Sequence, residues 1–353
     1  MNATTDAGHH LEDLEDLEDL EDLDQLAAHL RSYPALRAKA DIGLVSEVIG
    51  AASWVHGPGD DGAVVHMGAV APMGDRGAEG VTPMPIPAGY VIACGEALLP
   101  TFVAQDPYGA GIAAVLANVN DLAAMGATPC GIVDTIVGSA DIAREALRGM
   151  HAASLLYDVP LVGGHLTLHD GAPAISAFGI GHAESVLSLT HVAVGQSLVV
   201  ASCTQGTMRT DFPFFRSFDE RGTNMAGDVR LLAEVARSGA CVAAKDVSMA
   251  GLVGSLAMLL EWSRLGVRLD LDILPRPSAV PMAAWLTCFP AYSFLLCSPS
   301  GRENEVLAAF HTRGLEAAVV GTIDDTGLLS VTSRGRHATV LDLAATGVTG
   351  LQH

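Results

Sequence analysis

The pattern of apolar and polar positions along the chain predicts helices and strands in a mixed order. Apolar residues recur every three or four positions between Pro107 and Met125, which is typical of a helix with a buried face, and Gly126 can end it. The same spacing predicts a helix over 142–157. Short apolar runs between turns predict strands, and these lie at 63–67, 90–94, 131–137, 160–162 and 174–180.

A second set of elements begins near Gly195. Its apolar runs predict strands at 197–202, 294–297, 317–323 and 328–332. Apolar residues at helical spacing predict helices over 228–238, 250–265 and 303–313. The break between the two sets lies around 185–195. We therefore expect an α+β protein of two domains, 26–188 and 189–345.

The N-terminal part of the chain has a different pattern. Residues 11–24 read LEDLEDLEDLEDLD, a repeat of three residues. Leucines at this spacing advance by about 300° around an α-helix and form no apolar stripe. We interpret residues 1–25 as an acidic low-complexity tail, with a partner-binding arm as the alternative. Leu26, Leu30 and Leu36 then predict a helix up to Pro34 and a second short helix after it.

Composition narrows the class of protein. The 353 residues include 40 acids and 19 bases, and the resulting charge of −21 argues against binding to nucleic acid. Mean hydropathy is positive, at +0.36. However, the longest apolar run, Met282–Cys297, contains Pro290 and is shorter than the ~20 residues of a membrane span. Six scattered cysteines and no visible signal peptide lead us to expect a reduced, cytoplasmic protein.

Acidic and amide side chains occupy four places beside apolar elements. They lie in the turn GPGDDG, after the strand at 90–94, on the long helix, and next to one of the two lysines of the chain. The residues are Asp60 and Asp61, Glu96, Asn118 and Asp121, and Asp246 beside Lys245. A carboxylate among apolar helix residues, as at Asp121, is costly to bury unless it has a partner.

A divalent cation is one such partner. If these carboxylates converge, each pair repels, and Mg²⁺ removes the repulsion because it prefers carboxylate and phosphate oxygens. The alternative is that they are ordinary turn and capping acids. Gly163 and Gly164, before His165, can approach a phosphate closely, whereas the sequence contains no GxxxxGK[ST] loop and no HExxH zinc motif.

Four segments together resemble the aminoimidazole ribonucleotide (AIR) synthase superfamily, in the order of that family. They are GDDGAVV (59–65), ANVNDLAAMGATP (117–129), LVGGHLTL (161–168) and KDVSMAGLVGSL (245–256). The superfamily also includes thiamine-monophosphate kinase and selenophosphate synthetase. ALLPTFVAQDPYGAG (97–111) and His165 resemble the selenophosphate synthetase branch. That branch has a reactive Cys or selenocysteine in an N-terminal loop, whereas the first Cys of this sequence is Cys94. The chain is similar to an AIR synthase-related subfamily distinct from these enzymes.

The resemblance implies two AIR synthase-like domains, with the N-terminal domains paired as a homodimer whose strands form a barrel. It implies ATP and Mg²⁺ as cofactors. The implied metal ligands are Asp60, Asp61, Glu96, Asp121 and Asp246. Asp121 and Lys245 are the implied catalytic residues. The implied nucleotide contacts are Asn118, Gly163, Gly164 and His165.

The expected activity is ATP-dependent phosphorylation or activation of a small metabolite. Segment 204–224 departs from the family pattern, so we expect it to set substrate specificity. Lys245 and one of Arg209, Arg216 or Arg221 are the candidates for offsetting phosphate charge. Two alternatives stay open, a non-catalytic nucleotide-binding partner subunit and a metal-dependent hydrolase that does not use ATP.

Overall fold

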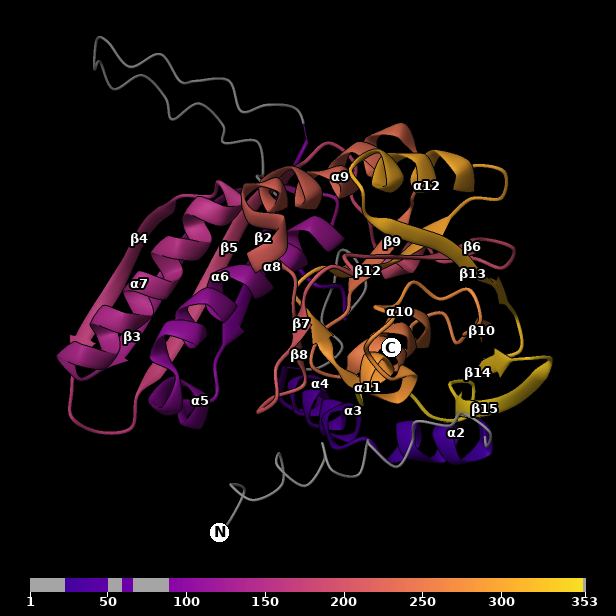
Figure 1. The fold of residues 1–353 in the computed structure, drawn as a ribbon, viewed down its shortest axis with the longest axis horizontal. Helices are drawn as coiled ribbons and strands as arrows, with labels where there is room; N and C mark the ends of the chain where they lie inside the picture. Colours follow the sequence, from indigo (N-terminus) through magenta and orange to yellow (C-terminus); the bar gives the residue numbers. More distant parts are fainter. Residues whose placement is uncertain (1–22, 50–58, 66–88, 352–353) are drawn as a thin grey trace.

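A computed structural model describes residues 23–49, 59–65 and 89–351 (Figure 1). Residues 11–22 of the acidic repeat lie outside the described residues, and so do positions 66–67 of the first predicted strand. The described chain forms two αβ units that lie side by side. Among the helices described, none combines the length and the apolarity that crossing a bilayer requires.

The first unit is a five-stranded sheet with helices along one face. The strand order is β1-β2-β5-β3-β4, antiparallel except for the pair β3 and β4. Its strands are β1 (Ala63–Val65), β2 (Tyr90–Ala97), β3 (Thr128–Gly138), β4 (Leu161–Leu168) and β5 (Ala174–Ala183). Its helices are α5 (Pro100–Gln105), α6 (Pro107–Ala124) and α7 (Ala140–Tyr157).

Helix α6 is buried over most of its surface because it packs on the sheet and, at very close range, on α7. An ideal Cβ on Gly111 would lie 2.1 Å from the Ala146 carbonyl oxygen, and one on Gly149 would lie 2.0 Å from that of Tyr108. Only glycine fits at both points, so these two residues fix how deeply the helices pack. The Asp106 carboxylate accepts a hydrogen bond from the Gly109 N–H at 2.8 Å and caps the start of α6.

The second unit is a seven-stranded sheet in the order β15-β14-β10-β13-β6-β12-β9. Its strands are β6 (Ser197–Ser202), β9 (Ala243–Asp246), β10 (Gly266–Asp270), β12 (Ser293–Ser298), β13 (Glu316–Asp324), β14 (Leu328–Ser333) and β15 (Arg336–Asp342). Its helices are α9 (Met225–Ser238), α10 (Gly251–Glu261), α11 (Met282–Thr287) and α12 (Glu303–Thr312). The last strand of the first sheet ends at Ala183, and the first strand of the second sheet begins at Ser197, on either side of the predicted boundary.

The N-terminal segment consists of four short elements. They are α2 (Leu23–Ser32), α3 (Pro34–Arg37), the 3-10 turn η1 (Ala38–Ile42) and α4 (Gly43–Ile49). The apolar face of α2 packs on β14 and β15 and joins the core of the second unit. The expected first domain begins at residue 26, whereas the structure packs α2 on the sheet of the second unit. Sequence order does not show which sheet buries the apolar face of a helix.

Several predicted elements differ from the structure at their ends. The short strand at 160–162 is the start of β4, which runs on to Leu168. The helix predicted over 250–265 ends at Glu261, since Arg264 adopts a left-handed φ of 52° and the chain then enters β10. Strands β9, β10 and β15 and the small sheet were not predicted. That small sheet contains β7 (Thr207–Met208), β8 (Phe214–Arg216) and β11 (Phe289–Pro290).

A buried ion triad ties segment 204–224 to the second unit. Asp228 of α9 is fully buried, and its carboxylate accepts hydrogen bonds from Arg221 at 2.7 and 2.9 Å and from Arg313 at 2.6 Å. Arg221 ends helix α8 (Phe218–Arg221), and Arg313 follows α12. Because two guanidinium groups satisfy one carboxylate, three elements depend on a single side chain.

We expect Asp228→Ala to lower the free energy of unfolding by about 3–5 kcal/mol, since both guanidinium groups lose their buried partner. Chemical denaturation followed by circular dichroism measures this change. The matched control is Asp141→Ala, because the Asp141 carboxylate is 92% exposed in its pair with Arg144 and should contribute nothing measurable. Equal stability of the two variants would contradict a structural role for Asp228.

Candidate metal and nucleotide site

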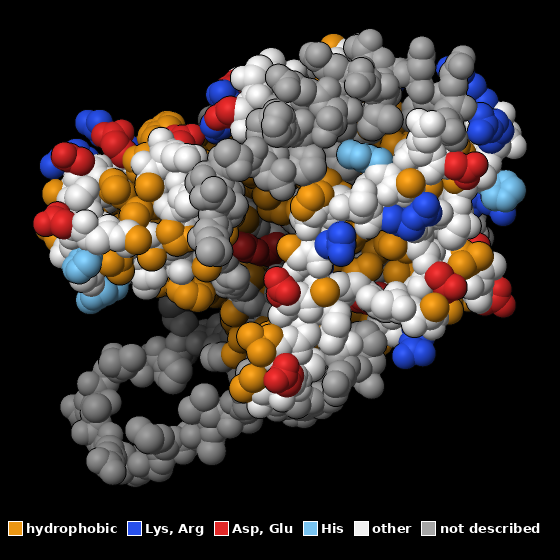
Figure 2. Space-filling model, turned by 90° about the horizontal axis from the view of Figure 1, so that it is seen from below, with side chains coloured by type: hydrophobic (Ala, Val, Ile, Leu, Met, Phe, Trp, Pro, Cys, Tyr) orange, Lys and Arg blue, Asp and Glu red, His pale blue; other side chains and the backbone are white. Residues whose placement is uncertain are grey.

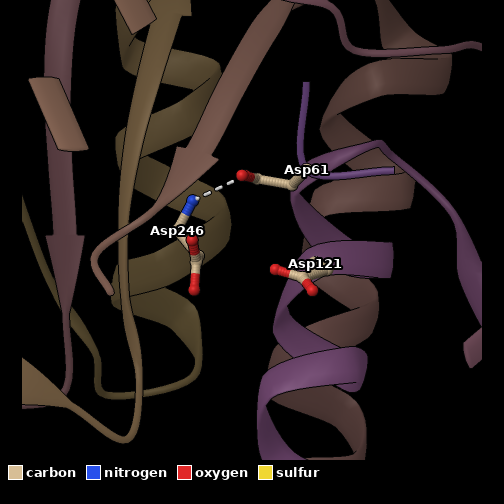
Figure 3. A group of neighbouring side chains, drawn as sticks. All are labelled: Asp61, Asp121 and Asp246. Atoms are coloured by element: carbon tan, nitrogen blue, oxygen red, sulfur yellow. Dashed lines mark hydrogen bonds between the residues drawn. The ribbon is translucent and has the colours of Figure 1, made fainter. Parts of the chain in front are cut away.

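Three carboxylates from distant parts of the chain converge where the two units meet. Asp61 lies in the turn before β1, Asp121 in the last turns of α6, and Asp246 at the end of β9. One oxygen from each lies within 4.8 Å of the others (Figure 3). Figure 2 shows acidic side chains at the bottom of a hollow between the units. The site is therefore built by both units together.

Asp61 connects the units through β9. Its Oδ2 accepts a hydrogen bond from the Asp246 backbone N–H at 3.2 Å, and its Oδ1 forms a close ion pair with Lys245 Nζ. The side chains of Lys245 and Asp61 are only 5% and 6% exposed. Burial alone would lower the pKa of Lys245, but the Asp61 and Asp246 carboxylates outweigh it and raise that pKa. Lys245 therefore stays charged.

The remaining carboxylates have raised pKa values. Burial, together with repulsion from Asp61, raises the pKa of Asp246 to about 7. Burial and the negative charges of Asp246 and Asp61 raise the pKa of Asp121 well above its ordinary value. Burial also raises the pKa of Glu96, on β2. Clustered acids with raised pKa values are typical of a site that binds a cation or transfers protons.

The donor set fits Mg²⁺. Ligands around an octahedral Mg²⁺ with 2.1 Å bonds are about 3.0 Å apart when adjacent and about 4.2 Å apart when opposite. Carboxylate oxygens within 4.8 Å of one another therefore have to move inward, and Asp61 has to share its oxygen with Lys245, for all three to bind one ion. Asp61, Asp121 and Asp246 supply only oxygen, which hard divalent cations prefer. The same residues can hold Mg²⁺ and leave coordination positions for phosphate or water.

Lys39, in η1, is a site residue that our sequence reasoning missed. Burial and repulsion from Lys245 lower its pKa, while Asp246, Glu96 and Asp61 act in the opposite direction. Lys39 is therefore within electrostatic reach of the carboxylates, although it forms no ion pair with any described one. The only two lysines of the chain act on the same group of acids. That scarcity among 19 bases was the signal in the sequence that could have identified Lys39.

Two predicted site residues have structural partners instead. Asp60 lies beside Asp61, but its carboxylate accepts hydrogen bonds from the Ser188 hydroxyl at 2.6 Å and the Leu189 N–H at 2.8 Å. Asp60 therefore ties the turn to the 3-10 helix η2 (Leu189–His191) and lies outside the converging group. Burial raises the pKa of Asp60 to about 6.

Asn118 holds α6 on the sheet. Its amide donates to the Ala114 carbonyl at 2.8 Å and to the Ala177 carbonyl at 3.2 Å, and its Oδ1 accepts from the Cys94 thiol at 3.2 Å. All its polar atoms are engaged by β2, β5 and its own helix. Asn118 therefore positions the helix that carries Asp121, and the structure does not direct it toward a ligand.

The glycine turn lies away from the carboxylates. Gly163, Gly164 and His165 belong to β4, at the edge of the sheet and three strands from β2. Three strand spacings correspond to about 14 Å. His165 pairs with Thr135 and faces the side of the sheet opposite α6. Within one subunit, the structure does not bring these residues to Asp121.

The arginines of segment 204–224 all pair with carboxylates nearby. Arg209 binds Asp211 at 2.7 Å and Asp106 at 3.2 Å, and Arg216 binds Asp219 at 2.5 Å. Arg221 is held by the buried triad described above. The expectation that one of them faces a phosphate therefore has no support in the described structure. Among the described residues, Lys245 and Lys39 are the bases whose charges act on the converging carboxylates.

Comparison with known proteins identifies the family. Residues 59–183 match the model of the AIR synthase related protein, N-terminal domain, and residues 217–334 match that of the C-terminal domain. An uncharacterized protein of Synechocystis sp. is 37% identical over 239 residues, which cover 67% of this chain and 74% of that protein. The chain belongs to the AIR synthase-related family.

Solved structures show the same two-domain fold. T. maritima PurL complexed with ADP superposes with a TM-score of 0.64 at 18% identity, covering 76% of this chain and 47% of PurL. AaThiL complexed with AMPPCP and TMP gives a TM-score of 0.60 at 16% identity, covering 85% of this chain and 96% of AaThiL. The two-domain AIR synthase-like fold that we expected is confirmed.

The raised carboxylate pKa values predict a site that destabilises the metal-free AIR synthase-like fold at neutral pH. Asp246 binds a proton in the folded state up to about pH 7, whereas its ordinary pKa is 3.8. Its contribution to stability is therefore present at acid pH and is lost as pH rises from about 4 to 7. We expect Asp246→Asn to raise the Tm of the metal-free protein by a few degrees at pH 8.

Differential scanning calorimetry in EDTA measures this effect. At pH 4 the two proteins should have similar Tm values, because the wild-type carboxylate is protonated there. Mg²⁺ at pH 8 should stabilise the wild type more than Asp246→Asn. A variant less stable than the wild type at pH 8 would contradict the interpretation.

Proposed function

We propose that this protein is an ATP- and Mg²⁺-dependent enzyme that phosphorylates or otherwise activates a small metabolite. The observation that carries this proposal is the convergence of Asp61, Asp121 and Asp246 beside Lys245, at the junction of the two units. The nucleotides in the PurL and AaThiL structures support it, since both proteins share this fold. Residues outside this group would determine which acceptor substrate binds.

In the proposed site, Asp61, Asp121 and Asp246 hold Mg²⁺, with Glu96 beside them. Bound Mg²⁺ neutralises phosphate charge and polarises the group that is transferred. Lys245 stays charged between Asp61 and Asp246 and provides positive charge to the phosphates. Lys39 supplies a second positive charge from η1. The buried position of these groups strengthens each interaction, because water screens it less.

Segment 204–224 is the proposed specificity element. Phe212 stacks on Phe102 of α5 at 6.3 Å, with the rings 6° from parallel. Arg209 pairs with Asp106, the cap of α6, which is the helix that carries Asp121. The segment is thus tied to both units near the start of α6. Asp106 is 15 residues from Asp121, about 22 Å along the helix axis, so the segment would contact the end of an extended substrate that is remote from the carboxylates.

We further propose that two subunits pair through the open face of the five-stranded sheet. Helices α6 and α7 lie along one face (Figure 1). On the other face, Phe178, Ile180 and Val65 are 46%, 41% and 41% exposed. Exposed apolar side chains on one sheet face mark an interaction surface. His165 lies on this face too, so a role of Gly163–His165 in nucleotide binding would require a second subunit.

We expect Asp121→Asn to weaken Mg²⁺-dependent ATP binding by on the order of 100-fold and to abolish turnover, since a charged ligand is lost. Calorimetry with MgATP, and a phosphate-release assay with a panel of metabolites, measure the two effects. Asp141→Asn, on the exposed surface of α7, is the matched control and should behave as the wild type.

The same measurements separate the alternatives. Tight MgATP binding without turnover on any metabolite would favour a nucleotide-binding partner subunit. No Mg²⁺-dependent affinity for ATP in the wild type would contradict the proposal and favour a metal-dependent hydrolase.

For the dimer, we expect Phe178→Glu to give a monomer, because the buried face would then hold two unpaired charges. Sedimentation velocity measures the mass. Leu155→Glu, a 64% exposed position on α7, is the control and should leave the mass unchanged. A monomeric wild type would contradict the proposed pairing.

A further inference from the structure

Residues 347–351, which we call the C-terminal strap, run back from β15 across the end of α10. The Glu261 carboxylate, at the end of α10, accepts hydrogen bonds from the Val348 N–H at 2.6 Å and the Thr349 N–H at 3.1 Å. Both Glu261 and Thr349 are buried. A buried carboxylate that binds two backbone N–H groups fixes the strap at one point.

Beyond this anchor, the strap contacts the N-terminal segment backbone to backbone. An ideal Cβ on Gly43 would lie 2.8 Å from the Gly350 carbonyl oxygen. An ideal Cβ on Gly350 would lie 3.0 Å from the carbonyl oxygen of Ala40, in η1. The close approach leaves no room for a methyl group on either glycine. The strap therefore packs directly against η1 and the start of α4.

The strap also reaches the turn that carries Asp61. An ideal Cβ on Gly59 would lie 3.9 Å from Cδ1 of Leu351 and 3.6 Å from the side chain of Leu189. Gly59 is two residues before Asp61, and Ala40 directly follows Lys39. The strap thus contacts the two backbone segments that place a positive and a negative charge in the site.

We propose that the C-terminal strap, anchored by Glu261, is a positioning element that holds η1, and with it Lys39, in place beside the site. Lys39 lies on a single short 3-10 turn that packs on its flanking helices α3 and α4. A five-residue turn has few interactions of its own, so its position depends on what it rests against. Gly350 and Gly43 provide that support. The nucleotide part of this inference rests on the proposed function, whereas the positional part does not.

Two substitutions test the contact from its two sides. Gly350 has a left-handed φ of +67°, so Gly350→Ala adds backbone strain as well as the contact with Ala40. Gly43 has a helical φ of −54°, so Gly43→Ala adds only the contact with Gly350 and otherwise favours the helix. The control is Gly314→Ala, at a φ of +69° with no described atom within 4 Å of its Cβ.

In the full-length protein without nucleotide, we expect both strap variants to speed hydrogen–deuterium exchange at residues 38–42, while Gly314→Ala leaves it unchanged. We expect both to weaken binding of Mg²⁺ with a non-hydrolysable ATP analogue by on the order of tenfold. Lys39→Ala should weaken binding to a similar extent. The double variant Lys39→Ala/Gly43→Ala should be no weaker than Lys39→Ala alone, because the strap acts through Lys39.

Unchanged exchange at 38–42 in both strap variants would overturn the proposal. So would losses in affinity that add in the double variant, since the strap would then act independently of Lys39. A wild-type protein that fails to bind the Mg²⁺–nucleotide probe would contradict the proposed function, and the exchange measurement would still decide whether the strap positions η1.

Discussion

Buried carboxylates that lie close together repel one another. The arrangement of the groups around Asp61, Asp121 and Asp246 offsets this repulsion. Two unit charges about 4 Å apart repel by about 4 kcal/mol at an intermediate dielectric, and less where water reaches them. Asp61, Asp121 and Asp246 meet under these conditions, with Glu96 close by. The pair with Lys245 and the charge of Lys39 offset part of this cost. The rest is free energy that a cation bound at the proposed site would recover.

A destabilising site needs a rigid frame. The chain provides it on one side through α6, which is locked by the glycine crossing with α7, by its Asp106 cap and by the hydrogen bonds of Asn118. On the other side, β9 pairs with β12 at the edge of the seven-stranded sheet. The Asp61 turn joins the two frames through Lys245 and the Asp246 N–H. Changes in the relative position of the units would therefore alter the distances between the carboxylates.

The sequence predicted the parts of this arrangement that are local. The spacing of apolar residues located α6, α7 and most strands, and the cost of burying Asp121 pointed to a cation before any contact was known. The resemblance to the AIR synthase superfamily supplied the convergence of Asp61, Asp121 and Asp246. It could not show that the Asp60 carboxylate turns to Ser188, because two adjacent aspartates look alike in a motif and only their backbone geometry separates them.

Contacts between residues far apart in the sequence could not be predicted from the apolar pattern, for a different reason. Helix α2 has an ordinary apolar face, and nothing local shows that β14 and β15 bury it. The triad around Asp228 joins residues 85 positions apart, and the strap joins Gly350 to Gly43. Strand pairings such as β10 with β14 depend on the assembled sheet. These contacts are determined by which surfaces remain unburied once the local elements have formed.

The segments outside the two family models change what the shared fold can do. The models cover residues 59–183 and 217–334, so Lys39, Gly43 and the strap lie outside both. Most of segment 204–224 does too. The shared part supplies the carboxylates, while the flanking parts supply Lys39 and the backbone that supports it. In the proposed site, the carboxylates hold Mg²⁺ and the lysines offset phosphate charge, so the proposed activity depends on how these outer segments pack against the common frame.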